Sequence, residues 1–264
     1  YVVTRTFTAT DDCGNSTQAT QTITIQDTTS PTLTVPEDYT AECSDELELA
    51  DATAIDNCGA VTISLSESTT PGACAQAYTL VRTFTAMDEC GNSTTASQTI
   101  TVVDTTAPAF NEALPMDATV ECDAVPAAAV LTATDNCQDV SVSFSESRED
   151  GDCDANYTLT RTWSVADDCG NASSHTQTVT IQDTTAPELT IAADYTAECD
   201  EEHPMDSASA TDNCGDVMIE EDMSVAYSCP HSYVITRVFT ATDECGNSTS
   251  ATQTITVQDT TAPA

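Results

Sequence analysis

Core-facing and polar positions alternate with a period of two along the most hydrophobic stretches of the chain. Every second position of 78–86 is Tyr, Leu, Arg, Phe or Ala, with Thr or Val between them, and the pattern returns at 157–165 and 233–241. Each run is followed by a Cys-Gly-Asn turn and a second alternating run, such as 98–102. Such runs about a Gly-Asn turn are typical of a β-hairpin. Because no stretch shows a helical period, the pattern predicts an all-β fold of immunoglobulin-like sandwiches.

These hairpins belong to a unit of just under eighty residues that repeats along the chain. A short Asp-Thr-Thr phrase ending in Pro closes each unit, and the Pro stiffens a junction too short to be a flexible tether. We therefore expect modules joined end to end. Their predicted bounds are a partial module at 1–27, complete modules at 28–104, 105–183 and 184–259, and the start of another at 260–264.

Cysteines return on the same grid, four to a module, and Cys13 occupies the last grid position of the partial module. Small modules bury little apolar surface and usually need disulfides or a bound metal for stability. Zinc is the competing interpretation, but zinc sites usually contain CxxC pairs, and here no two cysteines lie closer than fifteen positions. The 13 cysteines therefore favour disulfides formed in an oxidising compartment.

The strand directions predict which cysteines share an end of a module. We call the end beside the preceding junction the near end, and the other the far end. Successive strands place Cys43 at the far end, Cys58 at the near end, Cys74 at the far end and Cys90 at the near end. The alternation predicts two disulfides closed within each module, and Cys13 is then the unpaired half of such a bridge. The predicted pairs are Cys43–Cys74, Cys58–Cys90, Cys122–Cys153, Cys137–Cys169, Cys199–Cys229 and Cys214–Cys245.

The net charge of the chain limits the classes of molecule that it can bind. The chain has 44 acidic residues against five arginines and a formal charge of -39, so it repels nucleic acid and anionic membrane surfaces. No apolar run is long enough to cross a bilayer. We expect neither nucleic-acid binding nor membrane insertion.

Carboxylates and amides gather where the strand directions bring one module to the next. Calcium takes six to eight oxygen ligands, and many carboxylates in one place repel one another without a cation. We therefore hypothesise calcium at each junction; the alternative is that these residues only form turns. The candidate ligands are Asp27, Asp56, Asn57, Asp88, Asp104, Asp135, Asn136, Asp167, Asp183, Asp212, Asn213 and Asp243.

An arginine recurs at one core-facing strand position: Arg5, Arg82, Arg161 and Arg237. An arginine in a core needs a carboxylate partner, and the recurring Glu42, Glu121 and Glu198 are the expected partners. The alternative is that the arginines reach water at the sheet edge. The histidines lack a repeated nucleophile or carboxylate partner, and no phosphate-binding loop is present, so we expect no enzymatic activity.

The runs TATDNCGDV (209–217) and YVITRVFTATDECGNSTSATQTITVQDTTAP (233–263) resemble the hyalin repeat, or HYR, module. Similar modules stand in tandem in large surface proteins of Bacteroidota, including gliding and adhesion proteins, and the resemblance covers nearly the whole chain. It implies an immunoglobulin-like sandwich, an extracellular location and an adhesion or stalk role. Four evenly spaced cysteines per module depart from the pattern and favour a mechanically toughened module.

Two kinds of sugar-attachment signal recur. Asn15, Asn92, Asn171 and Asn247 begin N-x-S/T sequons, and Thr28, Thr105, Thr184 and Thr260 resemble the O-glycosylation signal of Bacteroidota. The alternative is that a Gly-Asn turn before a Thr-rich strand produces sequons by accident.

Together these features predict a structural repeat region of an extracellular bacterial surface fibril, with further copies of the module and covalent glycans as partners. The alternative is the stalk of an adhesin whose binding domain lies outside this chain.

Overall fold

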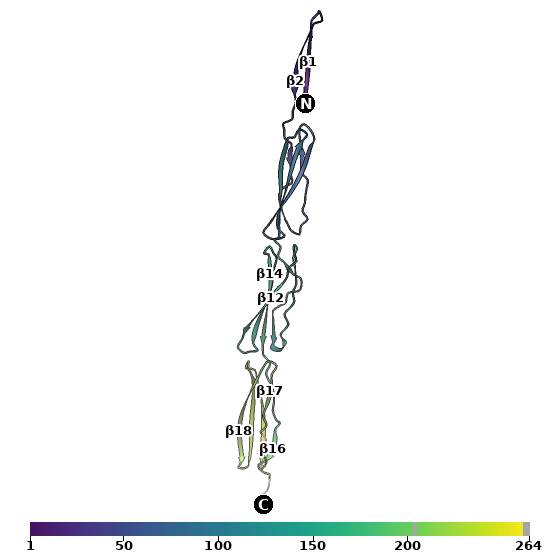
Figure 1. Cartoon of the computed structure of the whole chain (residues 1–264). Coiled ribbons are helices and arrows are strands. Elements are labelled where there is room, and N and C mark those ends of the chain that lie inside the picture. Colours follow the sequence, from purple (N-terminus) through teal and green to yellow (C-terminus); the bar gives the residue numbers. More distant parts are fainter. Residues whose placement is uncertain (203–204, 261–264) are drawn as a thin grey trace. The chain divides into compact units, whose positions relative to one another are not determined.

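The computed structural model describes residues 1–202 and 205–260, and confirms the predicted tandem β-sandwiches (Figure 1). The described residues form strands β1 to β20 and one short 3-10 turn, η1 (Cys122–Ala124). Within them, no helix has the length and apolar character to span a membrane. The predicted start of another module at 260–264 lies, beyond Thr260, outside the described residues.

The chain divides into two units. Unit 1 holds residues 1–108 together with two loops, 135–139 and 167–171, and unit 2 holds the remaining residues. These divisions do not follow the predicted module bounds, because two loops of module 2 (105–183) group with module 1 (28–104).

The partial module at 1–27 is a single hairpin. Strands β1 (Val2–Thr10) and β2 (Ser16–Thr24) pair antiparallel across a turn at Gly14, which has a φ of 85°. Phe7 is 57% exposed, although its equivalents in the complete modules are buried. The hairpin therefore has the strands that close a module without the sheet that would cover them.

Module 1 shows the architecture that each complete module repeats. One sheet has the order β4-β8-β7-β6, and a second sheet pairs β3 with β5. Strand β4 runs parallel to β8, whereas β6, β7 and β8 are antiparallel. The strands are β3 (Thr32–Thr34), β4 (Tyr39–Glu42), β5 (Thr53–Ile55), β6 (Val61–Pro71), β7 (Tyr78–Asp88) and β8 (Ser93–Val103).

Modules 2 (105–183) and 3 (184–259) repeat this topology, with sheets β10-β14-β13-β12 and β9-β11, then β16-β20-β19-β18 and β15-β17. Module 2 comprises β9 (Ala109–Phe110), β10 (Ala118–Glu121), β11 (Ala133–Thr134), β12 (Ser143–Asp150), β13 (Tyr157–Ala166) and β14 (Ala172–Gln182). Module 3 comprises β15 (Glu188–Thr190), β16 (Tyr195–Glu198), β17 (Ser209–Thr211), β18 (Val217–Cys229), β19 (Ser232–Asp243) and β20 (Ser248–Gln258).

The core lies under the central hairpin of each module. In module 2, Trp163 and Val165 of β13 and Val179 and Ile181 of β14 are buried at alternating positions, as the period of two predicts. Burying each such side chain contributes about 1.5–3 kcal/mol. The long central strands therefore hold the loops at the two ends of the module in place.

The buried arginines have carboxylate partners, but not the predicted ones. Arg82 is 3% exposed and donates to Glu67 of the neighbouring strand at 3.1 Å. Its guanidinium also donates to Gln98 Oε1, and equivalent networks hold the two other buried arginines, with pairs Arg161–Glu146 and Arg237–Glu221. The predicted partners Glu42, Glu121 and Glu198 are wrong, because each is the last residue of a short strand at the far end, whereas the arginine lies in the middle of its strand. Arg5 lies in exposed β1.

Candidate functional site at the module junctions

A repeated turn ties each hairpin to the junction before it. The Asp88 carboxylate accepts hydrogen bonds from the backbone N of Cys90 at 2.8 Å and of Asn92 at 2.9 Å. The Asn92 side chain donates back to Asp88 at 2.7 Å and to the carbonyl of Asp27 at 3.3 Å. Gly91 has a φ of 90°, which strongly favours glycine. The sequence Asp-x-Cys-Gly-Asn therefore builds a clamp on the junction.

The clamp recurs at the other junctions. Asn171 donates to the carbonyl of Asp104 at 3.1 Å, and Asn247 donates to that of Asp183 at 3.2 Å. Each of these asparagines also binds the aspartate that opens its own turn. Sequence reasoning took the asparagines as sequons and missed this contact, although an Asp four residues before an Asn after Gly is its signal.

Three aspartates lie together at two of the junctions, and two lie together at the remaining junction. One carboxylate oxygen from each of Asp27, Asp56 and Asp88 lies within 4.8 Å of the others. At the junction before module 3 the same holds for Asp183, Asp212 and Asp243. At the junction before module 2, Asp104 and Asp167 lie together beside Cys169, and Asp135 is close enough to act electrostatically on Asp104.

The predicted asparagine ligands lie differently. Asn57 and Asn213 direct their side-chain amides to the sulfur atoms of the adjacent Cys58 and Cys214, each at 3.0 Å. Asn136 donates to Ser44 Oγ at 3.1 Å. Their side-chain nitrogens therefore face sulfur or hydroxyl groups. Glu121, which was not a candidate ligand, instead lies with Asp183 and Cys214.

The electrostatics at the second junction fit a cation. Asp104 is 7% exposed, and its Oδ2 has no hydrogen-bond partner among the described residues, nor has that of Asp135. Burial raises the pKa of Asp104, and the charges of Asp135 and Asp167 raise it further. Burying an unpaired carboxylate is costly, and hard divalent cations bind carboxylate oxygens. The residues present therefore fit such a cation.

The carboxylates at the third junction are also buried and also repel one another. Burial raises the pKa of Asp183, and the charges of Asp212 and Asp243 add to the effect. The Oδ2 atom of Asp212 is also buried and unpartnered in the described residues. The Asp56 Oδ2 atom has the same character at the first junction. Each junction thus has a carboxylate oxygen directed away from solvent without a donor.

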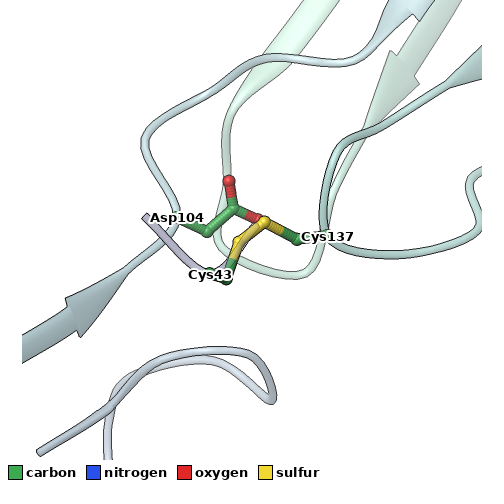
Figure 2. Close-up of side chains that lie close together, drawn as sticks. All are labelled: Cys43, Asp104 and Cys137. Carbon is green, nitrogen blue, oxygen red and sulfur yellow. A yellow bond between two sulfur atoms is a disulfide. The ribbon is translucent and has the colours of Figure 1, made fainter. Parts of the chain in front are cut away.

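Two disulfides bind the same junction, and both join different modules. Cys43 bonds to Cys137, with their Cα atoms 5.8 Å apart, and Figure 2 shows the Asp104 carboxylate beside this bridge. Cys74 bonds to Cys169 at a Cα distance of 5.0 Å. All four cysteines lie in unit 1. The far end of module 1 is therefore bonded to the two near-end loops of module 2.

Unit 2 repeats this arrangement. Cys122 bonds to Cys214 with a Cα distance of 5.8 Å, and Cys153 bonds to Cys245 at 5.3 Å. The two loops that receive these bonds are the same in each module, the Asp-Asn-Cys loop and the clamp turn. The pairing rule is therefore the same at both junctions.

The predicted pairing within modules is wrong for the eight bonded cysteines. Strand directions assigned the correct end to each of the eight bonded cysteines, since the bonds join far ends to near ends. A disulfide needs Cα atoms roughly 4.4–6.8 Å apart, and the short junctions bring this distance about between neighbouring modules. Two predicted pairs contain only unbonded cysteines, Cys58–Cys90 and Cys199–Cys229; these residues and Cys13 are free and exposed.

A cavity of about 570 Å³ lies at the first junction, where no disulfide is formed. Tyr1, Ile25, Asp27, Cys58 and Cys90 line it, together with one glutamine. Cys58 and Cys90 stand at the grid positions that accept disulfides at the next two junctions. This junction therefore has the aspartates and the clamp of the others, with its two sulfur atoms unbonded.

The glutamates expected to pair with arginine instead hold the junction peptide. The Thr105 backbone N donates to Glu42 at 3.1 Å, and the Thr105 hydroxyl donates to the same carboxylate. Thr184 binds Glu121 in the same manner, and Thr260 binds Glu198. These hydrogen bonds lower the pKa of Glu121 and Glu198, with the threonine hydroxyl as the main cause.

These contacts bear on the predicted glycosylation sites. A sugar on Thr105, Thr184 or Thr260 would replace the hydroxyl proton donated to glutamate. A sugar on the Asn92 amide would remove one of the two hydrogens used by the clamp. Asn15 is exposed, and its amide binds only Asp11 among the described residues. Attachment at Thr28 and Asn15 therefore disturbs fewest contacts.

Comparison with known proteins supports the module type. The family model described as "HYR-like domain with 4 cysteines" matches residues 110–181, which lie in module 2. No curated protein matches the sequence.

Solved cadherin ectodomains share low similarity with the chain. The protocadherin GammaB4 extracellular domain is 16% identical with a TM-score of 0.40, covering 97% of this chain and 54% of its own. Protocadherin Gamma B2 domains 1–5 are 15% identical with a TM-score of 0.39, covering 98% and 65%. Mouse Cadherin-23 EC22-24 is 13% identical with a TM-score of 0.37, covering 87% and 99%. The chain thus spans about half to two thirds of the length of the two protocadherin structures. Similarity at this level carries no information about function.

Proposed function

We propose that this chain is a structural repeat region of an extracellular surface fibril or filament, bacterial in origin. The observation that carries the proposal is that each disulfide joins two modules rather than closing one. Such bonds do little for the interior of one module and much for the connection between modules. They also favour an oxidising, extracellular compartment. The match to an HYR-like domain agrees with an adhesion-type repeat rather than an enzyme.

A divalent cation, with calcium as the candidate, would complete this junction. Asp104, Asp135 and Asp167 would hold it at the second junction, and Asp183, Asp212 and Asp243 at the third. The cation would neutralise buried carboxylates that otherwise repel each other beside the bridges. It would thereby stiffen the connection between modules that the disulfides make permanent.

Further modules of the same kind are the proposed partners. Cys58 and Cys90 are near-end cysteines, and Cys199 and Cys229 are far-end cysteines, all free. Each pair carries the chemistry to bond a neighbouring module by the rule that operates at the two bonded junctions.

Isothermal titration calorimetry of the purified chain with calcium, followed by elemental analysis, tests the proposed cation site. Heat and retained calcium are expected from the wild-type chain, and an Asp183→Asn and Asp212→Asn variant should lose the share of both that belongs to the third junction. The absence of any bound metal would remove the cation from the proposal.

Location and assembly need separate measurements. Antibodies against the chain should label intact cells, and labelling only after lysis would contradict an extracellular role. Electron microscopy of native material separates the two structural candidates, because a fibril gives regular filaments and an adhesin gives isolated stalks.

A further inference from the structure

The disulfides and short pieces of chain form continuous covalent lines. In each module a near-end and a far-end cysteine are separated by about 15 residues, and the other two by about 16. We call these pieces the spanning segments. They are 43–58, 74–90, 122–137, 153–169, 199–214 and 229–245. Each disulfide joins the far end of one spanning segment to the near end of a segment in the next module.

Two such lines run from module to module in addition to the main chain. One joins segments 43–58, 122–137 and 199–214, and the other joins 74–90, 153–169 and 229–245. Neither line passes through the junction peptides. Tension applied along the chain is therefore shared among three covalent connections at each bonded junction.

We propose that these two lines carry tension from module to module and limit how far the chain can be stretched. This mechanical role rests on the structural function proposed above, whereas the limit on extension follows from the pairing alone. An unfolded module that lacks such lines lengthens by its whole sequence. Here an unfolded module can lengthen only until its spanning segments are straight.

Module 2, which is bonded on both sides, shows the size of the effect. Its strand β13 has 10 residues, which rise about 33 Å in a folded sheet. A spanning segment reaches about 50–55 Å when fully extended, whereas a free module of this size would reach about 270 Å. Unfolding module 2 under tension therefore adds about 20 Å rather than more than about 200 Å.

The same connectivity protects the chain against cutting. Every peptide bond between Cys43 and Cys245 is bypassed by at least one disulfide. A single proteolytic cut there leaves the two pieces covalently joined. A stretched extracellular protein exposed to proteases would gain directly from this property.

Single-molecule force spectroscopy on the whole chain, held at its two ends, tests the proposal. The shortest covalent route through the oxidised chain follows 1–43, 137–153 and 245–264, where 137–153 crosses module 2 and connects the two lines. Its length is about 270 Å at about 3.5 Å per residue, against about 920 Å for the reduced chain. We expect a final contour length near the first value without reductant and near the second with dithiothreitol.

Matched variants separate this result from other causes. Cys43→Ser combined with Cys74→Ser removes both bonds at one junction and should lengthen the oxidised chain to about 600 Å. Cys13→Ser removes a free cysteine and should leave the length unchanged. An oxidised wild-type chain that extends to about 600 Å or more would overturn the inference. Failure to label the cell surface would instead contradict the structural function and leave the extension limit intact.

Discussion

Replacing Asp104 by Asn should change the stability of module 2 in opposite directions with and without calcium. Two carboxylate oxygens within 4.8 Å of each other repel by about 3 kcal/mol at an effective dielectric constant of about 20. Proton uptake and residual solvent remove part of this cost. In chelator we therefore expect the Asp104→Asn variant to be more stable than wild type by about 1–2 kcal/mol, or very roughly 4–15 °C in melting temperature.

Calcium should reverse the order. A cation present at about 100 times its dissociation constant stabilises the folded chain by about 2.7 kcal/mol. The variant loses a ligand and should lose most of this gain. Wild type should therefore melt above the variant in calcium and below it in chelator.

The single tryptophan provides the assay. Trp163 is 1% exposed and lies in β13, the strand that leads into Asp167 of the cluster. Its fluorescence during heating reports the unfolding of module 2. Asp139→Asn is the control, because Asp139 is an exposed residue of the same loop as Asp135 and lies outside the cluster. Equal shifts for both variants in both conditions would refute the cation site.

The pH dependence has a defined sign. Burial, then the charges of Asp135 and Asp167, raise the pKa of Asp104, so in chelator the folded state holds this proton more tightly than the unfolded state. The stability that Asp104 contributes is thus fully present below its ordinary pKa and lost as the pH rises through the raised pKa. The advantage of Asp104→Asn in chelator should be absent in acid and grow as the pH rises, which a series of melts can check.

Three further predictions follow from the contacts. Cleavage at a protease site engineered into the link 105–108 should leave one band on a non-reducing gel and two after reduction; two bands without reductant would contradict the bonds between modules 1 and 2. Glu67→Gln should cost module 1 about 1–3 kcal/mol in urea unfolding, because buried Arg82 loses its charged partner; an unchanged midpoint would contradict the pairing. Gly91→Ala should cost about 1 kcal/mol or more at its φ of 90°, whereas Gly59→Ala meets only an ordinary contact at 3.9 Å and should be nearly neutral.

The alternating pattern of core-facing and polar positions by itself determines that the chain forms sheets. A period of two places Trp163 and its neighbours on one face of a strand, and only a sheet buries such a face. The repeated Pro junctions and the cysteine grid likewise determined that the chain is an array. Strand directions then placed each cysteine at an end and gathered the junction aspartates, because hairpin geometry depends only on local sequence.

Only the tertiary structure identified the bonding partners that lie in another module or on a neighbouring strand. The sequence places Cys43 and Cys74 at one end of a module, but it does not reveal that the loops of Cys137 and Cys169 approach that end within bonding distance. The partner of Arg82 was missed for the same reason, since it depends on the register between β6 and β7. Local pattern determines which face and which end a residue occupies. The distances between segments far apart in sequence decide what that residue bonds to. Here those distances place the disulfides between modules, whereas the sequence predicted them within modules.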